Sequence, residues 1–317
     1  MVERDLSLSW DDRRWVESDT PWAAGCRWLQ SWWRAQVLNA LPGPKSSSGG
    51  KLVCSMLPLD IGQAANFLGA DIEAAVAARL SEGGHSGIIA KDRLYRNLLS
   101  SQPMCFNLFG PFVKHPDHLI EWVRTLDDSA VKVRRIRFEW APERCSHFDG
   151  GSAFDAFVEY TASTGGERFI GVECKYAENL ERSTIKLRNV YGDYTAGSAN
   201  WRDGASARLS AKHLRQFWLN TLLAQSLVDR GGGTYESGLV VVVAAAADRS
   251  ADEATASVRS DLIEADRWLR WCPYESVLDA TAGHDQWRQM FAKRYLDFGP
   301  VNHLLAANDP RQSVRQR

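Results

Sequence analysis

The sequence predicts an α/β fold, a mixed sheet flanked by helices, with an N-terminal helical extension. Hydrophobic residues recur with a helical period through the first 130 residues and then, from Val131 to Trp140, alternate with the period of a strand. Beyond this point strand-like and helical segments follow one another to about residue 296. Because such segments pack as layers, we expect helices on both faces of the sheet.

The composition fits a globular protein and excludes several other classes. Of 317 residues, 44% are hydrophobic, which suffices for a core in one large domain or two small ones. Lys and Arg number 38 against 39 Asp and Glu, so any nucleic-acid contact has to be a local patch. The six dispersed cysteines contain no CxxC pair, which argues against a disulfide framework and favours a reducing compartment.

Two features of the sequence argue for a cytoplasmic protein that does not act at a membrane. The charged N-terminus lacks the apolar stretch of a signal peptide. The longest apolar run, residues 239–247, is far shorter than the roughly 20 residues needed to cross a bilayer.

Cys145-Ser146-His147 is the nearest approach to a metal-binding spacing among the cysteines, and no second pair supports it.

The first 130 residues are expected to be mainly helical. In residues 1–41, Trp28 and Trp32 recur at i, i+4, which predicts a Trp-rich helical arm docked on the core; a surface that stacks on DNA or binds a partner is the alternative. Pro, Gly and Ser dominate residues 42–51, as is typical of a linker. A helical segment packed on the core follows at 52–130, with helices near 60–80, 91–101 (ended by Pro103) and 117–126.

The predicted sheet belongs to a core of residues 131–300, and residues 301–317 form a tail. Period-2 alternation indicates strands at 131–140, 152–161 and 168–176. A strand buried on both faces follows in the Val-rich run 239–247, and residues 274–278 suggest a short further strand. Helices complete the core at about 211–228, 252–269 and 286–296.

The segment 150–178 brings charged side chains to one face of a predicted hairpin. In its first strand Phe154, Ala156 and Val158 share one face and Asp155 lies on the other, whereas in its second strand Glu173 and Lys175 share a face. If the Gly-containing turn centres near residues 163–164, paired residues sum to about 328 and Asp155 lies opposite Glu173. The sequence therefore predicts that two carboxylates and one ammonium group lie together on one face of this hairpin.

This set of groups suits the hydrolysis of a phosphodiester. Adjacent carboxylates raise each other's pKa, and a divalent hard cation such as Mg²⁺ removes that cost. Such a cation polarises a phosphoryl oxygen and lowers the pKa of a water, while a neighbouring Lys can stabilise charge in the transition state. From the spacing alone, a cross-strand salt bridge on a solvated sheet face is an equally open interpretation.

The segment that follows, residues 177–216, is locally basic. Its seven basic residues outnumber four acidic ones, and aromatic residues are interleaved among them. This composition suits a loop that follows a phosphate backbone, although an ordinary solvated connection would have a similar composition. The basic residues are Arg182, Lys186, Arg188, Arg202, Arg208, Lys212 and Arg215, and the aromatic ones are Tyr191, Tyr194 and Trp201.

The pattern of Asp155 followed by Gly171-Val172-Glu173-Cys174-Lys175 resembles the D…(D/E)xK signature of the PD-(D/E)XK nuclease superfamily, which has a restriction-endonuclease-like fold. Residues 93–110, 138–142 and 173–178 are also similar to a group of bacterial restriction-endonuclease-like proteins. One departure is Ala153-Phe154, which stands where many members have Pro before the Asp. The resemblance implies Asp155 and Glu173 as ligands of Mg²⁺, for which Mn²⁺ can substitute, and Lys175 as the catalytic lysine.

Many members of this superfamily add an upstream Glu and a Gln on the helix after the motif. Glu139, near the end of the first strand, is the candidate for this further metal ligand, and Glu82 is a weaker one. Gln216 is the candidate for the catalytic Gln, because with Lys212 and Asn220 it makes a polar stripe on an otherwise apolar helix. Solvation of that helix face is the alternative.

These expectations describe a Mg²⁺-dependent DNA endonuclease in defence or DNA processing. A catalytically silent module of the same fold, which binds nucleic acid or a partner protein, is the alternative. The retention of Asp155, Glu173 and Lys175 favours the enzyme. Because one site per chain has to cut both strands of a duplex, a homodimer is also favoured.

Overall fold

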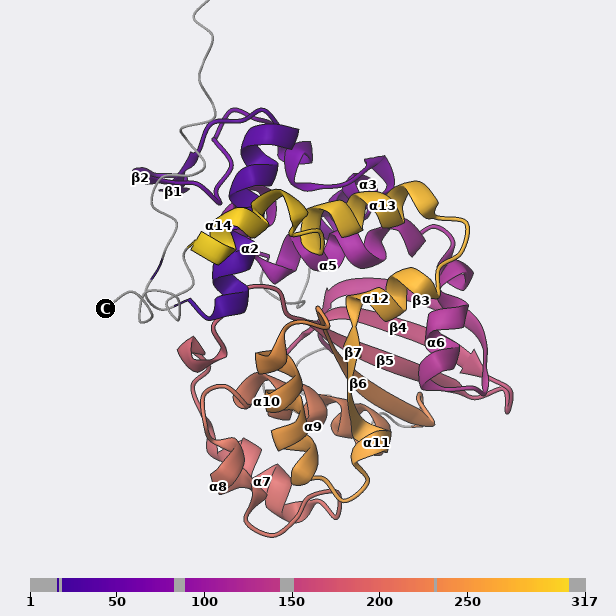
Figure 1. Cartoon of the computed structure of the whole chain (residues 1–317). Helices are drawn as coiled ribbons and strands as arrows, with labels where there is room; N and C mark the ends of the chain where they lie inside the picture. The colour runs from indigo at the N-terminus through magenta and orange to yellow at the C-terminus, as the bar shows by residue number, and fades with distance from the viewer. Residues whose placement is uncertain (1–15, 17–18, 83–88, 143–150, 231–232, 308–317) are drawn as a thin grey trace, which may run out of the picture.

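A five-stranded mixed sheet lies at the centre of the protein in this computed structural model (Figure 1). The structure describes residue 16 and residues 19–82, 89–142, 151–230 and 233–307. The strands lie side by side in sequence order: β3 (Ala130–Trp140), β4 (Phe154–Ala162), β5 (Glu167–Cys174), β6 (Ser237–Ala244) and β7 (Leu269–Pro273). The first three are antiparallel neighbours, whereas β6 pairs parallel with both β5 and β7.

The pairing between β4 and β5 confirms the predicted register. Ala156 lies opposite Val172 and Phe157 opposite Gly171, so paired residues sum to 328. Strand β6 is buried along nearly its whole length, as its run of apolar residues predicts for a central strand with helices on both sides.

Two hydrophobic cores, one on each face of the sheet, make the fold a three-layer sandwich. Ala156, Ile170 and Val241 belong to the first core, and Phe157, Phe169 and Val242 belong to the second. Phe154 departs from the predicted alternation, because its ring lies in the second core. A Cβ on Gly171 would lie 2.4 Å from that ring, so only glycine leaves room for it.

The first core is covered by helices from both ends of the sequence. The N-terminal ones are η2 (Gln63–Asn66), α3 (Ala70–Ser81), α4 (Lys91–Arg96), α5 (Ser101–Phe109), η3 (Gly110–Phe112), η4 (Pro116–Leu119) and α6 (Ile120–Leu126). The C-terminal ones are α12 (Tyr274–Asp279) and α13 (Asp285–Tyr295). The last helices, η6 (Gly299–Val301) and α14 (Asn302–Ala307), pack with Trp28 and Leu29 in a small separate cluster. Figure 1 shows α5 and α13 on the same side of the sheet.

Two predictions for this layer are wrong. Pro103 does not end a helix but lies in the first turn of α5, where its missing N–H removes no helical hydrogen bond. Residues 274–278 form a helix and not a strand, because Tyr274, Val277 and Leu278 follow the i, i+3, i+4 spacing of one buried helix face.

The segment 42–51, predicted as a linker, instead contributes to a two-stranded antiparallel sheet of β1 (Gly43–Ser46) and β2 (Gly49–Val53). Gly49 and Gly50 have φ angles of 106° and 116°, a region that favours glycine, so the Gly-rich composition serves a turn. The Arg96 guanidinium donates to the Pro44 carbonyl at 2.5 Å and ties this small sheet to α4.

The Trp-rich arm docks on the protein as predicted. It forms α2 (Pro21–Trp32), which Thr20 caps, followed by a π-helical turn, η1 (Trp33–Val37). Trp28 and Trp33 are buried, and Trp22 donates from Nε1 to the Tyr176 carbonyl at 2.5 Å. These tryptophans therefore hold the arm to the core. Trp10 and Trp15 lie outside the described residues.

The second core is covered by helices that follow β5 and β6. They are η5 (Leu180–Arg182), α7 (Asn189–Gly197), α8 (Ala205–Leu209), α9 (Arg215–Arg230), α10 (Arg249–Ser260) and α11 (Ala265–Trp268). Helix α9 packs on β5 and β6. Its N-terminal end lies near the carboxyl end of β5, because Gln216 on its first turn contacts Glu173.

Candidate active site

The β4–β5 hairpin brings the predicted carboxylates and the lysine together. The paired residues of β4 and β5 end at Ala156 and Val172, and Asp155 and Glu173 are the next residue of each strand at this end of the hairpin. Asp155 Oδ2 accepts a hydrogen bond of 2.8 Å from the Cys174 amide, so this carboxylate is fixed to the neighbouring strand.

Glu173 is the most tightly held side chain of the site. It is only 4% exposed, and both carboxylate oxygens have partners. Oε1 lies 2.5 Å from the Lys175 Nζ. Oε2 accepts hydrogen bonds from the side-chain amides of Asn220, at 2.6 Å, and Gln216, at 3.4 Å. Hydrogen bonds to a charged group are stronger than neutral ones, so these contacts fix the orientation of Glu173.

Helix α9 supplies the amide groups of the site. Gln216, the candidate for the catalytic Gln, contacts Glu173, but Asn220, one turn later, makes the shorter contact. Asn220 is completely buried, and its Oδ1 accepts from the Ser152 hydroxyl and the Gln216 amide. Lys212 lies exposed before the start of α9, so it does not continue the helical stripe. The i, i+4 spacing indicated that Asn220 shares a helix face with Gln216, but only the fold shows which of the two amides lies closer to Glu173.

Lys175 follows β5 directly and is held through its backbone as well as its ammonium group. Its amide donates to the Val243 carbonyl at 2.9 Å, and its carbonyl accepts from the Tyr274 hydroxyl. Burial would lower the pKa of Lys175, but the carboxylates of Glu173 and Asp155 raise it above its ordinary value. Lys175 is therefore a charged donor in this arrangement and not a free base.

Glu139 lies near the same carboxylates in a strained backbone conformation. Its φ angle of 45° is uncommon for a residue other than glycine. The Arg79 guanidinium donates to the carbonyls of Phe138, at 2.8 Å, and Glu139, at 3.3 Å, and the Gln102 amide donates to Glu139 Oε1 at 2.6 Å. The sequence did not reveal these partners, because Arg79 and Gln102 come from α3 and α5. Glu82, the weaker candidate, is exposed.

The electrostatics of the site indicate an excess of negative charge. Burial raises the pKa of Asp155 well above its usual range, and the charges of Glu173 and Glu139 raise it further. Burial also raises the pKa of Glu139, with a contribution from Glu173 that the hydrogen bond from Gln102 opposes. A bound cation would relieve this repulsion.

The donor set fits a hard divalent cation. In the described part of the chain, no three His, Cys, Asp or Glu side chains meet closely enough to hold a metal ion by themselves. Glu139 therefore acts on Asp155 through its charge without completing a cluster of three ligands. Mg²⁺ commonly takes one or two protein carboxylates and completes its shell with waters and phosphate oxygens, so Asp155 and Glu173 suffice. Cys145 and His147 lie outside the described residues.

The basic segment after β5 differs from the predicted loop. It contains η5, α7 and α8, and two of its interleaved aromatics, Tyr191 and Trp201, are buried in the second core. They are unavailable for stacking on bases. Six of its seven basic residues are exposed: Arg182, Lys186, Arg188, Arg202, Arg208 and Lys212. Of these, Arg208 pairs with Asp261, and Arg202 donates to the Ser260 carbonyl at 3.0 Å.

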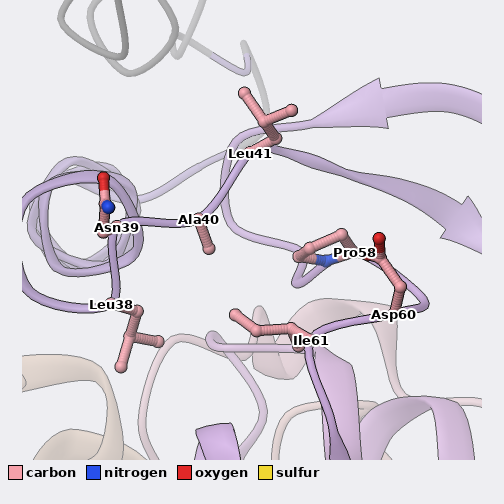
Figure 2. Close-up of a pocket in the computed structure, with 7 residues that line it drawn as sticks. All are labelled: Leu38, Asn39, Ala40, Leu41, Pro58, Asp60 and Ile61. Atoms are coloured by element: carbon pink, nitrogen blue, oxygen red, sulfur yellow. The ribbon is translucent and has the colours of Figure 1, made fainter. Parts of the chain in front are cut away.

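A cavity of about 420 Å³ lies apart from these residues. Figure 2 shows its lining, which consists of residues 38–41, Pro58, Asp60 and Ile61 and includes none of the site residues. In the described part of the chain, no helix is both long and apolar enough to cross a membrane.

Comparison with known families agrees with the fold and with the hairpin. The family model described as PD-(D/E)XK nuclease superfamily matches residues 17–297. The chain therefore belongs to the PD-(D/E)XK nuclease superfamily, whose members are usually nucleases and typically use divalent metals. Membership implies nucleic acid as the binding partner. Searches of the curated proteins and of the solved structures gave no match.

Proposed function

We propose that the protein is a Mg²⁺-dependent DNA endonuclease that acts in defence or DNA processing. The observation that carries this proposal is the convergence of Asp155, Glu173 and Lys175 at the end of one hairpin, with Lys175 and Glu173 in contact. Asp155 and Glu173 would hold the cation, with Glu139 as a third carboxylate beside them. Mn²⁺ would substitute for Mg²⁺.

The bound cation would supply Lewis-acid polarisation of the phosphodiester and a lower pKa for a water. Within the chain, Glu173 is oriented by Asn220 and Gln216. Lys175, kept charged by the carboxylates, donates to the negative charge that develops on the phosphoryl oxygens. Gln216, the less tightly bound amide, orients the water or the phosphate.

Exposed cations support contact with a nucleic-acid backbone, because Arg182, Lys186 and Arg188 lie on the segment that leaves the site. Cutting both strands of a duplex with one site per chain supports action as a homodimer.

The pure protein should relax or linearise supercoiled plasmid in Mg²⁺ or Mn²⁺ and leave it intact in EDTA. Linear and single-stranded substrates in the same buffers separate endonuclease from exonuclease action. Failure to cleave any of the three in either metal would reject the proposal.

A catalytically silent nucleic-acid-binding module is the second candidate. It is favoured by the full engagement of both Glu173 oxygens by Lys175, Asn220 and Gln216. Under this alternative, DNA binding persists while the cleavage assay stays negative in both metals.

A further inference from the structure

The edge strand β3 carries a row of basic side chains that the proposed catalytic groups do not include. Its pairing with β4 shifts register twice, between Ala130 and Lys132 and between Val133 and Arg135. Each irregularity adds one residue to β3. The first buried positions of the strand, Ala130, Val133 and Ile136, are therefore three residues apart and not two. The buried side chains all belong to the first core: Ala130, Val133, Ile136 and Phe138.

The two bulges turn extra cations outward. Lys132, Arg134 and Arg135 are exposed, and the side chains of Arg134 and Arg135 retain 56% and 59% of their accessible surface. Arg137, one-fifth exposed, completes the row. Bulges near active sites commonly redirect side chains in this way.

This row lies on the sheet face that carries the candidate site. Arg135 is paired with Glu159 and Arg137 with Phe157. Phe157 belongs to the second core, on the face where α9 brings Gln216 and Asn220 to Glu173. The row then reaches Glu139 at the carboxyl end of β3.

The row has more positive than negative charge. Glu159 binds both Arg135 and Arg137, and Glu167 pairs with Arg134. Within the described residues Lys132 has no ion-pair partner, and Glu82 acts on Arg135 at longer range. The four cations of β3 against these three carboxylates leave an excess of one positive charge. Because a strand rises about 3.3 Å per residue, these charges follow β3 as a line and not a cluster.

We propose that this row binds the phosphate backbone of DNA as it enters the site. The inference rests on the proposed function, because it takes DNA as the substrate. Three of the cations are exposed on a strand that leads to Glu139, and such side chains recognise backbone charge without reading sequence. Charged residues and bulges also protect edge strands from pairing with other chains, so edge protection is the competing explanation.

The test compares two double variants that each remove two exposed cations. Lys132→Ala/Arg135→Ala alters the row. Lys114→Ala/Arg267→Ala is the matched control, because both side chains are exposed, form surface ion pairs and lie on other elements. Binding of labelled duplex DNA is measured by fluorescence anisotropy over a range of salt concentrations, in Ca²⁺, with the duplex checked afterwards for cleavage.

Each phosphate contact contributes about 0.9 to the slope of log K against log salt, so the row variant should lose about 2 from the slope. It should weaken binding equally for two unrelated sequences, and the control should keep the wild-type slope. An unchanged slope in the row variant, an equal change in the control, or no salt-dependent binding by the wild type would overturn the inference. Self-association of the row variant with an unchanged slope would favour edge protection.

The outcome is separate from that of the proposed function. A row-dependent slope without cleavage supports the binding surface and rejects the endonuclease. Cleavage together with an unchanged slope supports the endonuclease and rejects this path for its substrate.

Discussion

Replacing Asn220 by Ala tests whether α9 fixes the orientation of Glu173. The Asn220 amide donates to Glu173 Oε2 at 2.6 Å, and both side chains are almost completely buried. After the substitution, Oε2 keeps only the contact of 3.4 Å from Gln216. Hydrogen bonds to charged groups contribute about 1.5–3 kcal/mol, so we expect the free energy of unfolding to fall by about that amount.

Gln216→Ala is the matched control, since it removes the same type of group from the same helix at the longer distance. The Gln216 side chain is half-buried, and we expect its removal to lower the free energy of unfolding by less than about 1 kcal/mol. Urea unfolding without added metal measures both variants, with the wild-type m-value as the condition for comparing midpoints. Equal losses in the two variants, or an unchanged midpoint for Asn220→Ala, would refute the reasoning.

Two further predictions concern the cation and acid stability. Glu173→Gln should bind Mg²⁺ or Mn²⁺ poorly in calorimetry, whereas Lys175→Ala, which keeps both carboxylates, should still bind the cation. Tighter cation binding by Glu173→Gln than by Lys175→Ala would reject Glu173 as a ligand. Burial would raise the pKa of Asp127, but hydrogen bonds from Ser129, Tyr160 and Arg168 lower it to about 2. Because this folded-state pKa lies below the unfolded value of about 3.9, the stabilisation is present above that value and is lost as pH falls towards 2. The difference in urea midpoint between wild type and Asp127→Asn should therefore shrink over this range, and a constant difference would contradict it.

Local patterns were sufficient to predict the hairpin and its register. Alternation located the strands of the hairpin, and the Gly-containing turn gave the pairing in which residue numbers sum to 328. Predictions from local patterns were wrong where the same residue types are compatible with two different structures. Residues 42–51 are rich in Gly and Pro because they form a turn and a small sheet, and Pro103 is compatible with the first turn of a helix as well as with its end.

Contacts between distant segments could not be predicted in this way. Gln102 reaches Glu139 across 37 residues, and no periodicity within either segment encodes that contact. Phe154 lies on the unexpected face because Gly171 leaves space for its ring on the neighbouring strand. The bulges of β3 likewise depend on its pairing with β4, so strict alternation could not reveal the basic row.

Plasmid cleavage by wild type and Lys175→Ala, in Mg²⁺ and in EDTA, tests the central claim most directly. The substitution leaves both carboxylates, so the variant should bind the cation. Because the Lys175 side chain is only 13% exposed, urea unfolding first confirms that the variant folds. Loss of one charge-stabilising donor typically lowers the rate by about 10²–10³. We predict Mg²⁺-dependent cleavage by the wild type and a loss of that size in the variant. Equal rates for the two folded, pure proteins would show that this hairpin is not the catalytic centre.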